Sequence, residues 1–119
     1  MLVIAVDIDG TITKESCWNR EQVLKATPNR KLIEMINDLY CKGYAIILYT
    51  CRGDSVIPAT RCWLKENHVK YHALNNNKLW ADIYLDDKGI SPDNFVKYGT
   101  KIINLAEKKR SRDRAPKNK

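Results

Sequence analysis

Acidic side chains follow a short apolar segment close to the start of the chain. Residues 2–6 ("LVIAV") are continuously apolar, and Asp7 and Asp9 come directly after them in "DIDGT". An isolated carboxylate is costly to remove from water, so two carboxylates at the end of a buried segment require a reason. The pair marks either an ordinary turn after a strand, where Asp and Gly are common, or a reactive site.

Two later apolar segments, "YAIILYT" and "ADIYLDD", also end in polar side chains. Their chemistry-bearing residues, together with a lysine that lies between the two segments, are Thr50, Lys78, Asp86 and Asp87. In open sheets of parallel strands, ligands bind beyond the carboxyl ends of the strands. We therefore expect these side chains to converge with the first acidic pair.

A cluster of four carboxylates suggests a bound cation. Without one, the carboxylates would repel one another and raise one another's pKa values. Mg²⁺ is a hard cation that takes oxygen ligands and can bridge to a phosphate. Thr50 and the amides after it can donate to phosphate oxygens, and Lys78 adds positive charge opposite the acids. The set suits phosphoryl transfer, in which positioning and charge neutralisation supply most of the catalysis.

Strands that alternate with helices must position these groups. The expected helices are residues 27–43 and 57–67, the expected strands are residues 2–6, 44–50, 69–74 and 81–87, and one or two helical segments follow from residue 91. Thr27 is the expected N-cap of the first helix and Gly43 its expected stop. The alternation predicts an α/β protein, a Rossmann-like three-layer fold with a parallel sheet.

Length and composition agree with one globular domain. The chain has 119 residues, of which 44% are hydrophobic. No apolar run approaches the roughly 18 residues of a membrane span, so we expect no membrane contact. The start of the chain lacks the pattern of a secretory signal, and the four cysteines show no CxxC pair or metal-ligand spacing. Reduced thiols and a cytoplasmic location are the resulting expectations.

The net charge of +7 is concentrated at the C-terminal end. Residues 108–119 ("KKRSRDRAPKNK") hold seven basic residues and one acid, which leaves +1 for residues 1–107. We predict a domain over residues 1–107 and a basic, disordered tail over residues 108–119. Such a tail can bind nucleic acid or another polyanion through counterion release, or can be a solvated end.

Taken in order, these residues resemble the four motifs of the haloacid dehalogenase (HAD) superfamily. The match runs from "DIDGT" through Thr50 and Lys78 to the "DD" of "ADIYLDD". The segment "YTCRGDSVIPATRCWLKENHV" is also similar to part of the phosphatase domain of polynucleotide kinases. Neither residues 11–27 nor "NNN" at 75–77 leaves room for a cap domain. The resemblance thus implies a small, capless HAD-like phosphatase.

The resemblance implies a role for each position. Asp7 would be the nucleophile that forms an aspartyl-phosphate, and Asp9 the general acid and then the base. The implied catalytic positions are Asp7, Asp9, Thr50 and Lys78; the implied phosphate-binding positions are Gly10, Thr11, Thr50, Cys51, Arg52 and Lys78; the implied metal positions are Asp7, Asp9, Asp86 and Asp87. Asp9 would contribute its backbone carbonyl to Mg²⁺, and Asp87 would bind directly or through water.

Three residues near the expected site allow two interpretations each. Arg52 follows Thr50 into the mouth of the site, where it could touch substrate or lie on the surface. The Cys51 side chain could be a redox-sensitive thiol, although a small buried neighbour is favoured. Trp18 is either a packing residue or a contact for the substrate.

The implied activity is that of a Mg²⁺-dependent phosphomonoester hydrolase. An open site suits a nucleic-acid terminal phosphate, or a small phosphorylated metabolite (a sugar phosphate or nucleotide) enclosed by a second copy in a homo-oligomer. A phospho-receiver module has similar residues, but its phosphorylated Asp ends a middle strand before the Thr, and "AIILYT" offers none. A non-catalytic module that binds phosphate or nucleic acid is the other alternative, although all the reactive side chains are present.

Overall fold

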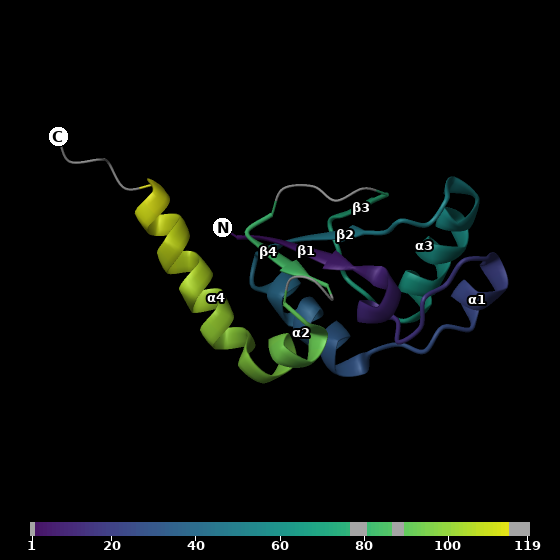
Figure 1. Cartoon of the computed structure of the whole chain (residues 1–119), viewed down its shortest axis with the longest axis horizontal. Coiled ribbons are helices and arrows are strands. Elements are labelled where there is room, and N and C mark those ends of the chain that lie inside the picture. Colours follow the sequence, from purple (N-terminus) through teal and green to yellow (C-terminus); the bar gives the residue numbers. More distant parts are fainter. Residues whose placement is uncertain (1, 77–80, 87–89, 115–119) are drawn as a thin grey trace.

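The computed structural model describes residues 2–76, 81–86 and 90–114, without the side chains of residues 111–114. Four parallel strands form one sheet in the order β3-β2-β1-β4 (Figure 1). The strands are β1 (Val3–Asp7), β2 (Ala45–Tyr49), β3 (Ala73–Asn75) and β4 (Ile83–Leu85). The helices are α1 (Arg20–Leu24), α2 (Arg30–Cys41), α3 (Ile57–Glu66) and α4 (Pro92–Arg114), with the short turns η1 (Ile8–Ile12) and η2 (Asp54–Val56). The predicted α/β class and parallel sheet are confirmed.

The alternation of side chains along the strands separates two apolar clusters. Ile4 and Val6 of β1 join the larger cluster, which also takes in buried residues of α2, α3 and α4. Ala5, between them in sequence, joins a smaller cluster with Tyr49 and Ala81. β1 is therefore buried on both faces, as its continuously apolar sequence predicts. This burial holds the end of β1 in a fixed position.

Helix α2 begins two residues later than the N-cap prediction requires. Asn29 caps it by accepting a hydrogen bond from the Leu32 N–H at 3.3 Å. Thr27 is instead engaged by the Glu15 carboxylate, which accepts from the Thr27 N–H at 2.8 Å and from its hydroxyl at 2.7 Å. The long-range contact to Glu15 overrides the local capping preference. Gly43, with φ +97°, ends the helix as predicted.

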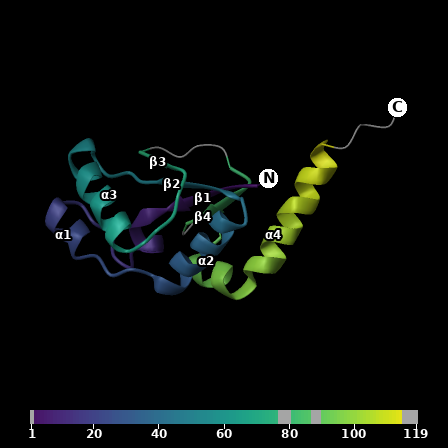
Figure 2. The same cartoon turned by 180° about the vertical axis from the view of Figure 1, so that it is seen from behind.

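The chain ends in one long helix, α4, with a kink at Tyr98. Its C-terminal half projects beyond the sheet (Figures 1 and 2). The first part of the predicted basic tail continues α4, which extends to Arg114, and the disorder of the tail stays a prediction. Lysine and arginine are good helix formers, and no glycine or proline interrupts this stretch before Pro116. The domain boundary at residue 107 stays a prediction, and residues 115–119 lie outside the described residues.

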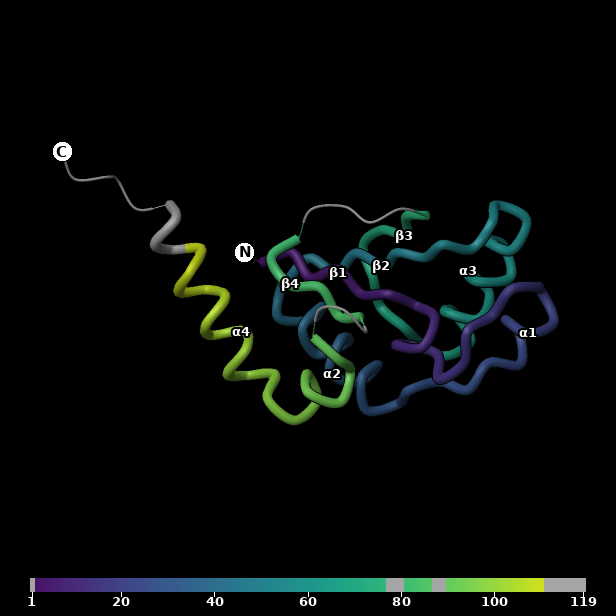
Figure 3. Tube along the Cα trace, viewed as in Figure 1, coloured from purple at the N-terminus to yellow at the C-terminus, as the bar shows by residue number. Residues whose placement is uncertain are grey.

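The path of the chain places two regions at opposite ends of the molecule (Figure 3). The first region lies beyond the carboxyl ends of the strands. It contains η1 and α1, which follow β1, and the start of α3, which follows β2. The C-terminal half of α4 lies near the N-terminus of the chain. Within the described ranges, no helix is both long and apolar enough to cross a membrane.

Candidate functional site

Two carboxylates lie side by side at the carboxyl ends of β1 and β4. Asp7 is the last residue of β1. Val6, one residue earlier, is in register with Leu85 at the end of β4, so Asp86 follows at the level of Asp7. Neighbouring strands are about 4.8 Å apart, which places both residues on one edge of the sheet. Asp86 is almost fully buried there.

The turn η1 returns the second aspartate of "DIDGT" to the same edge. Asp9 keeps a non-helical backbone, and Gly10 has φ +71°, a left-handed conformation that favours glycine. The Thr13 N–H closes the turn by donating to the Ile8 carbonyl at 3.0 Å. Thr11 is buried within it. The turn that Asp and Gly predict is therefore present, and it changes the direction of the chain within the five residues of η1.

The Asp9 carboxylate accepts hydrogen bonds from three different residues. Arg52 donates from Nη2 to Oδ1 at 2.8 Å and from Nε to both oxygens at 3.2 Å. The Cys17 N–H donates to Oδ1 at 2.9 Å, and the Thr50 hydroxyl donates to Oδ2 at 3.4 Å. These donors come from two separate segments of the chain, the turn after β2 and the segment before α1. They hold the Asp9 side chain in one orientation.

Arg52 is a buried residue of the site and not a surface side chain. Only 4% of the residue is exposed. Its Nη1 donates to the Thr60 hydroxyl at 2.8 Å, and that hydroxyl donates to the Val56 carbonyl at 2.8 Å. Helix α3 therefore holds the far side of the guanidinium while Asp9 holds the near side. The ion pair with Asp9 is the part of the site that the sequence motifs did not indicate.

Thr50 connects β2 to the same network. It is fully buried, and its N–H donates to the Asn75 carbonyl at 3.0 Å, which continues the pairing of β2 with β3. Its hydroxyl accepts from the Arg52 N–H at 3.1 Å. The structure thus brings Thr50 together with Asp9, as the convergence argument predicts, and Arg52 joins them.

A tyrosine that the motifs do not include supports Asp86. The Tyr49 hydroxyl donates to Oδ2 of Asp86. Tyr49 is buried at the end of β2 and is in register with Asp7 on β1. The one sequence signal for it is a hydroxyl-bearing aromatic residue at the end of an otherwise aliphatic strand.

The donor set at this edge suits a hard divalent cation. Asp7 and Asp86 offer carboxylate oxygens, which Mg²⁺ prefers. The Asp9 carboxylate is instead engaged by Arg52. Among the described residues, no three His, Cys, Asp or Glu side chains gather into a complete metal site. Lys78 and Asp87 lie outside the described residues, and their roles stay predictions.

A hollow of about 300 Å³ opens over the carboxylates. It is lined by Asp7, Asp9, Gly10, Thr11, Ser16, Trp18 and Cys51. The expectation that Cys51 is buried is wrong, because its side chain is exposed at the edge of this hollow. Trp18 is 75% exposed, and its N–H donates to Gln22 Oε1 at 2.8 Å. A fixed backbone therefore presents an exposed aromatic ring beside the acids.

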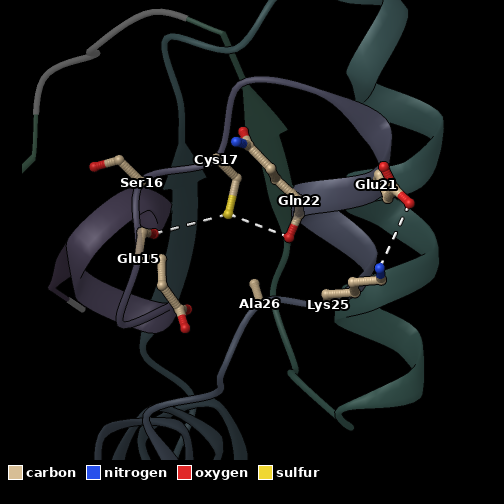
Figure 4. Close-up of a pocket in the computed structure, with 7 residues that line it drawn as sticks. All are labelled: Glu15, Ser16, Cys17, Glu21, Gln22, Lys25 and Ala26. Carbon is tan, nitrogen blue, oxygen red and sulfur yellow. Dashed lines mark hydrogen bonds and ion pairs between the residues drawn. The ribbon is translucent and has the colours of Figure 1, made fainter.

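A second hollow, of about 370 Å³, shares Ser16 with the first (Figure 4). Its other lining residues are Glu15, Cys17, Glu21, Gln22, Lys25 and Ala26. The Cys17 thiol lies between the carbonyls of Glu15 and Gln22, and burial raises the pKa of this thiol. Two glutamates and one lysine make the hollow net acidic. Such a surface does not favour a second phosphate.

The chain matches a known protein family over most of its length. Residues 2–107 match the family described as the polynucleotide kinase PNKP phosphatase domain. A comparison with curated proteins finds no match.

The fold of this chain is similar to those of several solved structures. A crystal structure of a Vibrio cholerae protein is 24% identical, with a TM-score of 0.70, over 92% of this chain and 99% of that chain. The Pnkp1/Rnl/Hen1 complex contains a chain that is 17% identical, with a TM-score of 0.55, over 80% of this chain. A Pnkp1/Rnl/Hen1 RNA repair complex matches at 17% identity and a TM-score of 0.56 over 88% of this chain. The chain spans about a third of those two larger chains (33% and 32%).

Proposed function

The chain belongs to the family of polynucleotide kinase PNKP phosphatase domains within the HAD superfamily, and we propose that it hydrolyses phosphomonoesters through an aspartyl-phosphate on Asp7. The observation that carries the proposal is the network around Asp9. Arg52, Thr50 and the Cys17 amide orient one carboxylate beside another, in a hollow lined by both acids.

Asp7 is the proposed nucleophile. It ends a strand that is buried on both faces, so its backbone position is fixed, and its side chain lines the hollow. Attack by a carboxylate oxygen on phosphorus would form an aspartyl-phosphate and release the alcohol of the ester. Hydrolysis of this intermediate by water then returns Asp7 and releases inorganic phosphate.

Asp9 is the proposed acid and base. It would protonate the leaving oxygen in the first step and take a proton from the attacking water in the second. Both transfers require one carboxylate to stay beside the same phosphorus. The bonds from Arg52 and Cys17 supply that orientation.

The proposed cofactor is Mg²⁺, which HAD-superfamily phosphatases generally use. Asp7, Asp86 and the Asp9 carbonyl would hold it, with Asp87 directly or through water, and the ion would neutralise charge between the nucleophile and the phosphate. The Tyr49 hydroxyl would orient Asp86. Thr50, Lys78 and the amides of Cys51 and Arg52 are the proposed phosphate contacts.

We propose a nucleic-acid terminal phosphate as substrate. The family match supports this choice, and so does the exposed Trp18 ring, on which a terminal base can stack. Residues 8–29 after β1 and residues 76–82 after β3 leave no room for a cap domain, so the proposed site is capless and open to a polymer end. A small phosphorylated metabolite is the alternative outcome of the same assay.

Phosphate release tests the proposal. The substrates are oligonucleotides with 3′- or 5′-phosphates, mononucleotides and sugar phosphates, each with Mg²⁺ and with EDTA. We expect multiple turnovers that EDTA abolishes, a preference for oligonucleotide ends, and a loss of about a thousandfold or more in Asp7→Asn. Stable phosphorylation without turnover would favour a receiver module, and full activity of Asp7→Asn would exclude the proposed nucleophile.

A further inference from the structure

The outward side of α4 carries exposed lysines with two large apolar side chains among them. We call this set the α4 outer face; its members are Lys97, Tyr98, Lys101, Leu105, Lys108 and Lys109. Tyr98 is 47% exposed and Leu105 is 57% exposed. Lys101, Leu105 and Lys108 follow one another at spacings of four and three residues, so they share one side of the helix. The row is longer than a single turn of the helix.

Contacts on the opposite side of α4 determine which residues face outward. Phe95 and Ile103 are buried in the larger apolar cluster. Gly99 lies so close to the Met35 side chain that an added Cβ would collide with it. Because this side packs against α2, the lysines of the α4 outer face point into solvent.

Two further contacts anchor the projecting half of the helix. The Tyr44 hydroxyl donates to Glu107 Oε1 at 2.6 Å, and Arg110 donates to Asp82 Oδ2 at 2.8 Å. Asp82 also accepts from the Val3 N–H at 2.6 Å. Glu107 and Asp82 are therefore engaged away from the α4 outer face. Among ion pairs between described residues, none involves Lys101, Lys108 or Lys109.

The same contacts locate this half of α4 at the amino ends of the strands. Tyr44 directly precedes β2, and Asp82 directly precedes β4. The hollow over Asp7 lies at the carboxyl ends of the strands. Figure 1 shows that the C-terminal half of α4 lies at the opposite ends of the strands. A ligand on the α4 outer face therefore does not compete for the hollow.

We propose that the α4 outer face binds the phosphate backbone of a nucleic acid, as a second contact distinct from the catalytic hollow. The choice of polymer rests on the proposed function, and the charge complementarity comes from the lysine row. Lysines that neutralise phosphates release counterions, which gives affinity without sequence preference. Lys97 Nζ lies over the Tyr98 ring, 5.2 Å from the ring centroid, which keeps this positive charge at the surface. Two isolated apolar residues are too few for the apolar face that seats a helix in a membrane surface.

The separation of the two contacts predicts a dependence on polymer length. The two contacts lie at opposite ends of the strands, so a nucleic acid needs a minimum length to touch both of them. A substrate well below this length can occupy the hollow or the α4 outer face. A longer substrate reaches both, so its apparent affinity rises through the second contact.

The test compares two charge-reversed proteins. Lys101→Glu/Lys108→Glu changes the α4 outer face, and Arg61→Glu/Lys65→Glu makes the same change in net charge on exposed positions of α3. Binding is measured by fluorescence anisotropy with an oligonucleotide duplex of about 25 base pairs that has hydroxyl ends, at several salt concentrations. We expect at least a roughly tenfold weaker Kd and a shallower salt dependence for the α4 variant, with little change for the α3 variant.

The remaining outcomes separate this inference from the proposed function. Equal weakening in both variants, or none in the α4 variant, would overturn the binding role of the α4 outer face. Binding of the α4 face to anionic vesicles in preference to the duplex would also overturn it. Turnover of a small phosphate ester is measured in parallel, and we expect both variants to keep the wild-type rate. If the wild-type protein binds the duplex through α4 but hydrolyses no ester, the proposed function is wrong and the proposed binding role of the α4 outer face is supported.

Discussion

The two edges of the sheet each hold an arginine–aspartate pair, and the pairs differ in what they do. Both Arg52–Asp9 and Arg110–Asp82 have their closest nitrogen and oxygen 2.8 Å apart. The Arg52 side chain is 1% exposed, whereas that of Arg110 is 22% exposed. The first pair joins the turn after β1 to the turn after β2, and the second ties α4 to the start of β4. Similar chemistry therefore orients the proposed acid–base carboxylate, Asp9, at one edge and anchors a helix at the other.

The difference shows how burial changes the consequence of an ion pair. A buried guanidinium that loses its partner keeps an uncompensated charge away from water, whereas a partly exposed one is solvated. The edge that holds Asp9 therefore depends on each member of its hydrogen-bond network. The α4 edge instead leaves most of its charge in solvent, where it can meet a polyanion.

The largest effect is expected from breaking the Arg52–Asp9 pair. Arg52→Ala leaves Asp9 without its main donor, so we expect a loss of about 3 kcal/mol in the free energy of unfolding and about a hundredfold in kcat. Arg110→Ala is the matched control, with an expected loss of about 1 kcal/mol and an unchanged kcat. Urea unfolding and turnover of a small ester measure both. Equal loss of activity in the two variants would contradict the distinction between the edges.

The next effect concerns the Tyr49 hydroxyl on Asp86. Removing the hydrogen bond in Tyr49→Phe frees the carboxylate to rotate, and we expect a Kd for Mg²⁺ about ten times larger. Tyr44→Phe removes a hydroxyl at the opposite edge and should leave the Kd unchanged. Calorimetric titration of each protein with Mg²⁺ reads the affinity without relying on turnover. Unchanged affinity in Tyr49→Phe would show that Asp86 needs no such support.

A smaller effect is expected from the exposed aromatic residues, Trp18 at one edge and Tyr98 at the other. Trp18→Ala removes the ring beside the hollow, and we expect KM for a 3′-phosphorylated oligonucleotide to rise about tenfold. The rise should be absent for an oligonucleotide whose terminal residue lacks its base. Tyr98→Ala, at the α4 outer face, is the control for a short substrate. An equal rise with and without the terminal base would refute stacking on Trp18.

The smallest effects concern the free energy of unfolding at the extremes of pH. A carboxyl group at one edge loses its contribution in acid, and a phenol at the other edge loses its contribution in alkali. Hydrogen bonds from Thr27 lower the pKa of Glu15, so this contribution to stability is present above about pH 4.3 and is lost as the pH falls through the lowered pKa. The bond to Glu107 raises the pKa of Tyr44, so that contribution is present below about pH 10 and is lost as the pH rises through the raised pKa.

Variants separate the two limbs of this pH dependence. Glu15→Gln should flatten the acid limb of the unfolding free energy, and Tyr44→Phe should flatten the alkaline limb. Urea unfolding across the pH range measures both. A change of the same limb in both variants would contradict the assignment.

The parts of the site that follow strand ends were predictable from the sequence. Buried strands show as continuous apolar runs, and parallel strands place Asp7, Thr50 and Asp86 on one edge whatever the details of packing. The turn after β1 was equally predictable, since Gly10 is the residue that a left-handed backbone favours.

The predictions failed where a distant group changed a local preference. Thr27 has the side chain of an N-cap, but Glu15 engages it and Asn29 caps the helix. Cys51 was expected to be buried because small thiols usually are, yet the turn after β2 exposes it.

By itself, the sequence determined the α/β class, the parallel strands and the edge at which the acids gather. These features depend on periodicity and on residues close together in the chain. Only the tertiary structure decided that Arg52 binds Asp9, 43 positions away, and that Tyr49 supports Asp86, 37 positions away. Such pairings depend on how the turns and α3 pack against the sheet. Local sequence preferences do not specify which distant side chain will form a hydrogen bond with a buried charged group.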